Sequence, residues 1–551
     1  MRIQHACYSG TGFEPTTITE LIQWRACHFP HERAFSFLSD GGTSAPQVTF
    51  GELDRNAKRI AGWLQLRGLG GERALLIYPP GMDYIVAVFG CLYAGVTAVP
   101  AYPPDPTRLS RTLPRLHAIA RDAQAAAILT TGSVLAMMKM VNIGRRVARN
   151  AQKIPFWGRL GKSLSSRLSA GAATPETEDL AALKWLSTEE LDDGFAQGWT
   201  QPPLTGDTIA FVQYTSGSTR EPLGVLLSHE NLLHNLALIH RAMEIRTEHE
   251  AVFWLPMYHD MGLIGGVLGP LYEGIPCTLF SPLIFLRRPL LWLQTISRIK
   301  DRPVISGGPN FAYDLCVRKI SAQQQSQLDL SRWELAFCGA EPVRPQTIER
   351  FSEVFGSCGF RKNAFYPCYG LAEATLIVSG GRAQDPPVFC ALIKEAIARN
   401  KAVETDPKDN QAQVLVGCGR ALMDERIVIV EPQSLRRCFP GEVGEIWVSS
   451  PSVAQGFLGR PEETEQVFRA RLADTGEGPF LRTGDLGFLS GGNLFVTGRE
   501  KEMIIVRGRN LYPHDIELSA GRSHPALTTG AGASFSVEVD GEERLVVVYE
   551  V

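Results

Sequence analysis

The sequence lacks an excess of charge of either sign. Among its 551 residues, 55 lysines and arginines are matched by 58 aspartates and glutamates, which gives a net charge of −3 at pH 7. A protein that binds nucleic acid or an anionic membrane over its whole surface needs a large positive excess. This balance excludes a histone-like protein, and we expect no nucleic-acid partner.

Paired cysteines are also absent. The 11 cysteines are spread from Cys7 to Cys438, and no two of them have the spacing of a CxxC pair. Disulfide frameworks and zinc ribbons both depend on such paired spacing. We therefore expect free thiols and a cytoplasmic protein.

Long hydrophobic runs are scarce. One range, Ile85–Tyr102, carries no charge and approaches the length of a membrane span. Gly95 divides this range into a helix-like half and a β-branched run, so a buried helix followed by a buried strand is the better interpretation. We expect no transmembrane segment.

Short apolar runs do recur, and in the first part of the chain they alternate with helical patterns. Such alternation predicts an α/β fold with mostly parallel sheets covered on both faces. From about Val414 onward, strand-like runs follow one another and predict a β-rich part. The expected strands are Ala74–Tyr78, Val96–Val99, Ala125–Leu129, Ile209–Val212, Gly224–Leu227, Cys277–Phe280 and Pro303–Ser306, and then Val414–Val416, Arg426–Val430, Glu445–Val448 and Leu494–Val496.

The strongest local signal is a loop of small and hydroxyl residues, Tyr214–Thr219, between two of the expected strands. Backbone N–H groups converge in such a loop and bind phosphate oxygens. The loop lacks the Gly-Lys-Ser/Thr of a Walker motif. A plain turn and a phosphate site remain as two interpretations of the loop by itself.

Three familiar catalytic patterns do not fit. His229 and His234 lie five residues apart, whereas a zinc-binding helix needs four, so this segment is expected to be a helix start with Ser228 as its N-cap. Neither a GxSxG nucleophile elbow nor a GxGxxG dinucleotide motif is present. A serine hydrolase and a Rossmann dehydrogenase are therefore poor interpretations.

Four further segments combine charge with glycine or aromatic neighbours at expected loop edges. They are Trp254–Asp260, Tyr369–Thr375, Arg482–Asp485 and Gly498–Lys501. An aspartate can hold ribose hydroxyls, an aromatic ring can cover a purine, a glutamate can bind Mg²⁺ and an arginine can bind phosphate. Each segment alone could be a structural turn, but the set is typical of a nucleotide-dependent ligase.

These segments resemble the adenylate-forming superfamily of acyl-activating enzymes, and within it the fatty acyl-AMP ligases. Longer stretches that carry the subfamily resemblance are Ser281–Pro289, Ser306–Tyr313, Phe365–Tyr369 and Arg507–Pro513. The superfamily segments are Tyr214–Thr219 for phosphate, Leu255–Asp260 for the aromatic-histidine segment, Gly339–Pro342 and Tyr369–Glu373 for adenine and magnesium, Thr483–Asp485 for ribose and Gly498–Glu502 for the hinge.

The resemblance implies a two-step reaction in which a fatty acid and ATP form acyl-AMP, and the acyl group then passes to a holo acyl carrier protein. ATP and Mg²⁺ are the implied cofactors. Glu373 would bind Mg²⁺, Tyr369 would cover the adenine, Asp485 would hold the ribose and Arg499 would reach the ribose or phosphate. The other implied residues are His259 and Thr219 for catalysis, Thr215, Ser216, Gly217, Ser218, Gly339, Ala340, Glu341 and Gly370 for ATP, Trp254, Met257, Gly307 and Gly308 for the acyl chain, and Glu502 as the hinge.

The implied architecture is a large N-terminal domain of two α/β subdomains and a β-rich subdomain, followed by a small, incomplete mobile C-terminal lobe. The expected boundaries are 1–200 and 201–380 for the α/β subdomains, 381–413 for a subfamily insertion, 414–498 for the β-rich subdomain and 499–551 for the hinge and partial lobe. The insertion, polar and helix-prone, is expected to restrain the lobe and to favour acyl-AMP over acyl-CoA. An acyl-CoA ligase and a non-catalytic binding homologue remain as alternatives.

Two departures from the superfamily pattern accompany this resemblance. The phosphate loop continues with Arg220, Glu221 and Leu223 in place of the usual glycine and basic residue. The catalytic lysine expected near the end of the small lobe is absent, which predicts weak adenylation by this chain.

Separately, Lys139–Arg167 is strongly basic and would be either a solvated helical surface or a docking surface for an acidic partner.

Overall fold

The computed structural model describes residues 13–39, 45–104, 109–140, 180, 183–189, 191–215, 222–506, 509–524, 527, 532–539 and 542–550. The chain divides into two compact units whose segments interleave along the sequence. Unit 1 comprises Met1–Ala237, Phe253–Ile284 and Ala454–Pro461, and unit 2 comprises Leu238–Val252, Phe285–Val453 and Glu462–Val551.

Unit 1 is built around a six-stranded sheet in the order β6-β5-β3-β4-β7-β8. Its neighbours run parallel except β7 and β8, which form an antiparallel pair. A smaller group joins β1 in parallel to β10 and antiparallel to β2. The strands are β1 (Arg33–Leu38), β2 (Gln47–Thr49), β3 (Arg73–Ile77), β4 (Thr97–Pro100), β5 (Ala127–Thr130), β6 (Lys184–Ser187), β7 (Ile209–Tyr214), β8 (Gly224–Ser228) and β10 (Cys277–Phe280).

The uncharged range near residue 90 is a helix followed by a strand, as predicted. Every residue of α3 from Tyr84 onward is buried, and Gly95 ends the helix in the left-handed conformation that favours glycine. Among the described residues, no helix has the length and apolar character needed to cross a membrane. The helices that accompany this sheet are α1 (Ile18–His28), α2 (Phe50–Leu66), α3 (Met82–Ala94), α4 (Leu109–Asp122), α8 (Gly194–Gln197), α9 (His229–Ala242), the π-helix η3 (Met261–Leu268) and α10 (Gly269–Glu273).

Unit 2 contains a mixed sheet in the order β17-β14-β13-β12-β11-β9. The central strands β9, β11, β12 and β13 are parallel, and β14 and β17 add antiparallel edges. The strands are β9 (Glu250–Phe253), β11 (Val304–Gly307), β12 (Trp333–Cys338), β13 (Phe365–Gly370), β14 (Ile377–Gly380) and β17 (Arg420–Ala421). The helices are α11 (Pro282–Arg287), α12 (Leu290–Arg298), α13 (Asn310–Lys319), α14 (Ala322–Gln325), α15 (Pro345–Gly356), η4 (Lys362–Ala364) and η5 (Ala372–Ala374).

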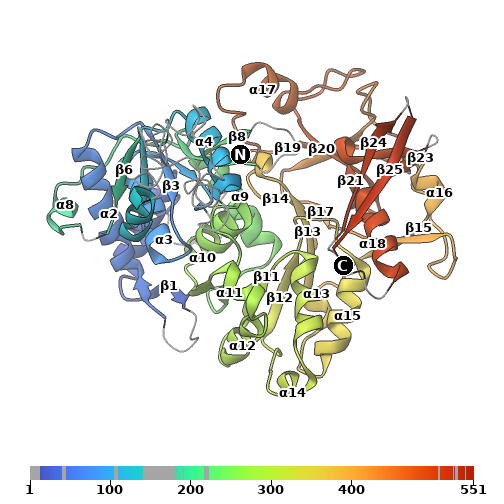
Figure 1. The fold of residues 1–551 in the computed structure, drawn as a ribbon, viewed down its shortest axis with the longest axis horizontal. Helices are drawn as coiled ribbons and strands as arrows, with labels where there is room; N and C mark the ends of the chain where they lie inside the picture. The colour runs from blue at the N-terminus through green and yellow to red at the C-terminus, as the bar shows by residue number, and fades with distance from the viewer. Residues whose placement is uncertain are drawn as a thin grey trace, which may run out of the picture. The chain divides into compact units, whose positions relative to one another are not determined.

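Aromatic side chains fill the layer between this sheet and its helices. The rings of Trp292, Tyr313 and Trp333 lie within 5.1 to 6.2 Å of one another between centroids. Phe351 of α15 also meets Trp333 of β12, edge to face. Because these rings come from α12, α13, α15 and β12, they fix the helices on the sheet (Figure 1).

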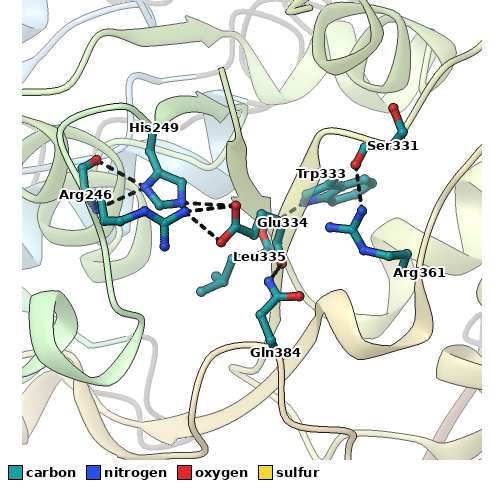
Figure 2. Close-up of polar contacts among 8 residues, drawn as sticks. All are labelled: Arg246, His249, Ser331, Trp333, Glu334, Leu335, Arg361 and Gln384. Carbon is teal, nitrogen blue, oxygen red and sulfur yellow. Dashed lines mark hydrogen bonds and ion pairs between the residues drawn. The ribbon is translucent and has the colours of Figure 1, made fainter. Parts of the chain in front are cut away.

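Charged and amide side chains close the amino-terminal end of the same sheet (Figure 2). Arg246 Nη2 lies 2.9 and 3.1 Å from the two carboxylate oxygens of Glu334, at the start of β12. The buried ring of His249 accepts a hydrogen bond from the Arg246 backbone N–H through Nδ1 (2.9 Å). Gln384 Nε2 donates to the backbone oxygen of Glu334 (2.8 Å), so these contacts tie three segments together at that end.

The rest of unit 2 is rich in strands, as predicted. A four-stranded antiparallel sheet has the order β18-β19-β20-β21 and comprises Arg426–Val430, Gly444–Ser449, Leu481–Ser490 and Asn493–Arg499. Three hairpins accompany it: β15 with β16 (Phe389–Ile393, Ala412–Val416), β22 with β23 (Ile504–Val506, Arg509–Leu511) and β24 with β25 (Gly532–Val539, Glu542–Tyr549). The short helices are α16 (Lys394–Ile397), α17 (Pro461–Phe468), η6 (Glu500–Glu502) and α18 (Pro513–Ser523).

The fold class predicted from the sequence is confirmed, with one local error. Residues 381–413 were expected to be helix-prone, but they contain strand β15 and only the one-turn helix α16. Phe389–Ile393 is a continuous apolar run whose three middle residues are buried, which suits a strand packed in a core. The subdomain boundaries expected at 200, 380, 413 and 498 stay predictions.

Candidate active site

The carboxyl ends of three neighbouring parallel strands in unit 2 carry residues implied by the resemblance. β11 ends at Gly307, β12 is followed by Gly339 and β13 ends at Gly370. A Cβ atom at Gly307 would lie 2.3 Å from the Phe337 oxygen, and one at Gly370 would lie 1.7 Å from the Leu376 oxygen. Glycine is therefore required where these strands end, at the edge where parallel sheets bind ligands.

The turn after β12 has an unusual backbone. Ala340 is exposed and adopts a φ of 68°, which is uncommon for a residue with a Cβ atom. The next side chain, Glu341, accepts a hydrogen bond from the Phe311 backbone N–H through Oε1 (3.3 Å). This contact ties the turn to the start of α13, directly after the predicted acyl-chain residues Gly307 and Gly308.

Tyr369, Asp485 and Arg499 form one cluster. The Tyr369 hydroxyl donates to Asp485 Oδ2 (2.7 Å), and Arg499 Nε lies 3.2 Å from Asp485 Oδ1. Arg499 and Asp485 are cross-strand partners of β21 and β20, which places the guanidinium beside the carboxylate. Burial raises the pKa of Asp485, and the opposing effects of Arg499 and Tyr369 favour the charged form.

Glu373 lies in the one-turn helix η5, directly after the strand that carries Tyr369. Its charge is close enough to raise the pKa of Arg499, together with Asp485 and Glu502, against the opposing effect of burial. The following loop is held tightly because Thr375 is fully buried, has a φ of 69° and donates its hydroxyl to the Ser452 oxygen (2.6 Å). The structure thus places a carboxylate near the Tyr369–Asp485–Arg499 cluster.

Asp485 sits on a β-bulge. Trp447 pairs with Arg482 and Glu445 pairs with Leu486, so Ile446 alone lies opposite the three residues 483–485. Gly484 takes a φ of 69°, and the Asp485 N–H donates to Thr483 Oγ1 (3.1 Å). Bulges of this kind re-aim a side chain beside an active site.

A buried carboxylate, Glu445, supports the bulge from the neighbouring strand. Its Oε1 accepts the Gly484 N–H (3.1 Å), and its Oε2 accepts Trp447 Nε1 (2.9 Å) and Arg482 Nε (3.0 Å). Arg482 Nη2 is also 2.8 Å from Oε2. Sequence reasoning missed Glu445, although a lone glutamate at the start of an apolar run was a signal of a paired buried charge.

The predicted phosphate loop belongs to unit 1. Ser216, Gly217, Ser218 and Thr219 lie outside the described residues, as do the departures Arg220 and Glu221. The residues that border the loop are anchored: the Thr215 N–H donates to the Leu223 oxygen (3.1 Å). The Tyr214 hydroxyl, at the end of β7, donates to Asp122 Oδ2 (2.6 Å).

The predicted histidine and two predicted acyl-chain residues also lie in unit 1. Trp254 and Met257 are buried, whereas about half of the His259 side chain is exposed. His259 pairs with Asp260, whose hydrogen bond and charge raise the pKa of the imidazole against the opposing effect of burial. Asp260 in turn caps the π-helix η3 by accepting the Met261 N–H (2.6 Å), and π-helices are frequent at functional sites.

The segment that follows β8 is a helix start and has no metal-like arrangement. Ser228 Oγ accepts the Asn231 N–H (3.2 Å), while Asn231 Oδ1 accepts the Ser228 N–H (3.0 Å), as expected for an N-cap. His229 Nδ1 accepts the Ile18 N–H (3.2 Å) inside the core. Across the part of the chain that the structure describes, no group of three or more His, Cys, Asp or Glu side chains could hold a metal by itself.

The structure therefore gathers one part of the predicted set within unit 2. Tyr369, Gly370, Glu373, Asp485 and Arg499 lie together there, and Glu502 follows in η6. Gly307, Gly308, Gly339, Ala340 and Glu341 follow the neighbouring strands of the same sheet. Thr215, Trp254, Met257 and His259 belong to unit 1.

The family model described as "AMP-binding enzyme" matches residues 22–458 of the chain. Among characterised relatives, the chain is 45% identical to the medium-chain-fatty-acid–[acyl-carrier-protein] ligase JamA of Moorena producens, over 98% of this chain and 86% of that protein. It is 34% identical to the long-chain-fatty-acid–AMP ligase FadD32 of Mycolicibacterium smegmatis, over 92% of this chain and 77% of that one.

A solved structure is similar over nearly the same length. The fatty acyl-adenylate ligase from L. pneumophila, determined in complex with acyl adenylate and pyrophosphate, matches with a TM-score of 0.78 and 37% identity. The match covers 97% of this chain and 86% of that one.

Proposed function

Because this chain belongs to the AMP-binding enzyme family, we propose that it activates a fatty acid with ATP and passes the acyl group to a holo acyl carrier protein. The similarity to fatty acid–carrier-protein ligases and to a fatty acyl-adenylate ligase supports both steps. The protein is thus an acyl-adenylate-forming ligase.

The reaction balances in two steps. A carboxylate oxygen attacks the α-phosphorus of ATP, the bond to the β-phosphate oxygen breaks, and acyl-AMP and pyrophosphate result. The thiolate of the carrier's phosphopantetheine then attacks the acyl carbonyl carbon, and AMP leaves. Both steps bring anions together, so the protein contributes mainly by positioning them and by balancing their charge.

The observation that carries the proposal is the Tyr369–Asp485–Arg499 cluster at the carboxyl edge of the unit 2 sheet. A carboxylate whose neighbours fix both oxygens can accept two hydrogen bonds from vicinal ribose hydroxyls. Arg499 brings a positive charge to the same place, which suits a phosphate group. The aromatic ring of Tyr369 beside them provides a surface for a purine.

Within this cluster, one carboxylate is suited to bind Mg²⁺. Mg²⁺ in ATP-dependent enzymes is held by one or two carboxylates together with the substrate phosphates, and seldom by an all-protein cage. Glu373 offers one carboxylate near Arg499 and Asp485, and the described residues form no larger cluster. We therefore assign Glu373 as the Mg²⁺ ligand, where the ion would balance phosphate charge.

The remaining roles are assigned by chemistry. His259 can donate a hydrogen bond to an anion because Asp260 favours its protonated form. Buried Trp254 and Met257 offer apolar surface for an acyl chain. Ser216–Thr219 would bind ATP phosphates through the loop that Tyr214 and Thr215 anchor.

The contacts of the 381–413 segment support a carrier protein as the acceptor. Its apolar residues Cys390, Leu392 and Ile397 belong to one buried hydrophobic cluster with Phe488 of the β-rich part and Tyr512 beyond the hinge. Gln413 Nε2 also donates to Asp515 of α18 (3.0 Å). These contacts favour one position of the residues after the hinge. Such a restraint favours transfer of the acyl group to a carrier protein over transfer to CoA.

Mass spectrometry tests the proposal directly. The protein is incubated with ATP, Mg²⁺ and a panel of fatty acids of different lengths, and the products are searched for acyl-AMP. Accumulation of acyl-AMP, followed by loading of a holo carrier protein, is the expected result. Efficient acyl-CoA formation would instead favour an acyl-CoA ligase, and binding of ATP without any adenylate would favour a non-catalytic homologue.

A further inference from the structure

We propose that Glu445 is a positioning residue for ATP, acting through the bulge that presents Asp485. The inference rests on the proposed function, because it takes Asp485 as the group that holds the ribose. Glu445 itself lies on β19 and is 1% exposed, so it meets no substrate. Its role is to fix the backbone from which Asp485 projects.

On the side that faces β19, the bulge has few backbone constraints. Three residues of β20 lie opposite Ile446 alone, so the regular ladder of hydrogen bonds is interrupted there. Gly484 within the bulge has no Cβ atom and adopts a left-handed φ of 69°. A glycine in such a turn has more conformational freedom than any other residue, so side-chain contacts must hold it in place.

Glu445 supplies such a contact through a carboxylate that is itself held in place. Oε1 accepts the Gly484 N–H at 3.1 Å, while Oε2 is held by Trp447 and Arg482. Arg482 also stacks over the Trp447 ring, 5.6 Å from its centroid, which fixes the guanidinium. A charged acceptor makes the hydrogen bond to Gly484 stronger than a neutral acceptor would.

The contact between Glu445 and Gly484 lies next to Asp485 in the chain. The residue directly after Gly484 is Asp485, whose N–H donates to Thr483 Oγ1, and the Thr483 hydroxyl donates to the Ile446 oxygen (2.7 Å). The bulge is therefore held to β19 at both residues that precede Asp485, through the Thr483 hydroxyl and the Gly484 N–H. Displacement of a binding group by about 1 Å can cost roughly a hundredfold in rate.

The test uses the ribose as the probe. Michaelis constants for ATP, 2′-deoxyATP and 3′-deoxyATP are measured in fatty-acid-dependent pyrophosphate release, for the wild type, Asp485→Ala, Glu445→Gln and the double variant. Glutamine keeps the shape of the side chain but removes its charge. Because a hydrogen bond to a charged group is stronger than one to a neutral group, the Michaelis constant for ATP should rise roughly 10- to 100-fold in Glu445→Gln.

The preference for ATP over the deoxy nucleotides should fall in Glu445→Gln toward its value in Asp485→Ala. The double variant should be no worse than Asp485→Ala, since the two residues act as one unit. A merely structural role would reduce the folded fraction and lower activity equally for all three nucleotides. The matched control is Glu477→Gln, which breaks the ion pairs of Glu477 with Arg426 and Arg437 elsewhere in unit 2 and should change none of the ratios.

A folded Glu445→Gln variant that keeps the wild-type ribose preference would overturn the inference. If that variant does not fold, Thr483→Val tests the same bulge by removing the hydroxyl that joins Ile446 to Asp485, and an unchanged preference there overturns it equally. An Asp485→Ala variant with wild-type preference would instead remove the ribose assignment of the proposed function.

Discussion

The orientations of single side chains in this protein depend on partners that lie far away in the sequence. Tyr369 and Asp485 are separated by 116 positions, yet one hydrogen bond of 2.7 Å joins them. His229 and Ile18 are separated by 211 positions and share another. In both cases burial raises the free-energy cost of losing the hydrogen-bond partner. A substitution at one residue therefore affects the other.

Replacement of Glu373 by glutamine tests the assigned metal ligand. Glutamine keeps the size of the side chain but loses the negative charge, so adenylate formation should fall roughly 10²- to 10³-fold. The measurement is acyl-AMP yield at saturating Mg²⁺, with thermal unfolding as the check on folding. Glu353→Gln, on the exposed side of α15, is the matched control and should leave the yield unchanged; a normal yield in Glu373→Gln would remove the assignment.

The buried side chain of His229 should make the free energy of unfolding depend on pH. Burial lowers the pKa of His229 from 6.5 to about 4. The unfolded chain therefore binds a proton more readily than the folded protein between these two values. The contribution of His229 to the free energy of unfolding is complete above about pH 6.5, and about 3 kcal/mol of it is lost as the pH falls to about 4.

Urea unfolding at a series of pH values measures this slope. His229→Asn keeps an acceptor for the Ile18 N–H but does not titrate, so its stability should depend less on pH in that window. His31→Asn changes an exposed histidine and should keep the wild-type slope. Equal slopes for wild type and His229→Asn would contradict the prediction.

At the scale of elements, packing decided what local sequence did not. The charged side chains of Lys394, Glu395 and Arg399 in the 381–413 segment are exposed. Leu392 and Ile397 enter the core instead, and Glu404 accepts the Ser490 hydroxyl (2.8 Å). The segment is therefore held to the rest of unit 2 mainly by burial of its apolar side chains.

Shortening this segment should change the acceptor. Deletion of Ile393–Asp409 removes α16 but leaves the ladder from Phe389↔Val416 to Leu392↔Gln413. A restraint of about 3 kcal/mol on the residues beyond the hinge depopulates an alternative position more than a hundredfold. The ratio of acyl-CoA to acyl-AMP should rise in the deletion variant, measured by mass spectrometry with CoA present.

Gln413→Ala serves as the matched single-residue change, because it removes only the hydrogen bond to Asp515. One hydrogen bond is worth about 1 kcal/mol, so this variant should shift the same ratio about fivefold. A deletion variant that still makes no acyl-CoA would mean that the segment has no part in acceptor choice.

At the scale of the whole molecule, charge is balanced overall but unevenly distributed along the sequence. The net charge is −3, whereas Lys139–Arg167 is strongly basic and contains no acidic residue. Most of this stretch lies outside the described residues. Its chemistry suits a partner with an acidic surface, and electrostatic attraction of this kind acts chiefly on the rate of association.

Charge reversal of Arg145, Arg146 and Arg149 to glutamate tests that interpretation. Transfer from acyl-AMP to a holo carrier protein should slow at low salt, roughly tenfold or more, and the difference from wild type should shrink as salt screens the charges. Acyl-AMP formation should not change, because no carrier takes part in that step. Equal transfer rates at low salt would mean that the stretch is a solvated surface.

The sequence by itself determined several of the elements and the segments that supply the candidate site residues. Runs of apolar residues predicted both ends of β10 and β18 as observed, and Ser228 predicted the start of α9. Strand patterns and helix caps can be predicted in this way because they depend on residues close in the sequence. The segments around Tyr369 and Asp485 were also found by residue type alone. Only the tertiary structure decided that Tyr369 donates to Asp485, that Glu445 accepts the Gly484 N–H of the bulge, and that Leu392 and Tyr512 share one hydrophobic cluster. These contacts join residues brought together by the sheets, and no local pattern specifies which buried partner a side chain will meet.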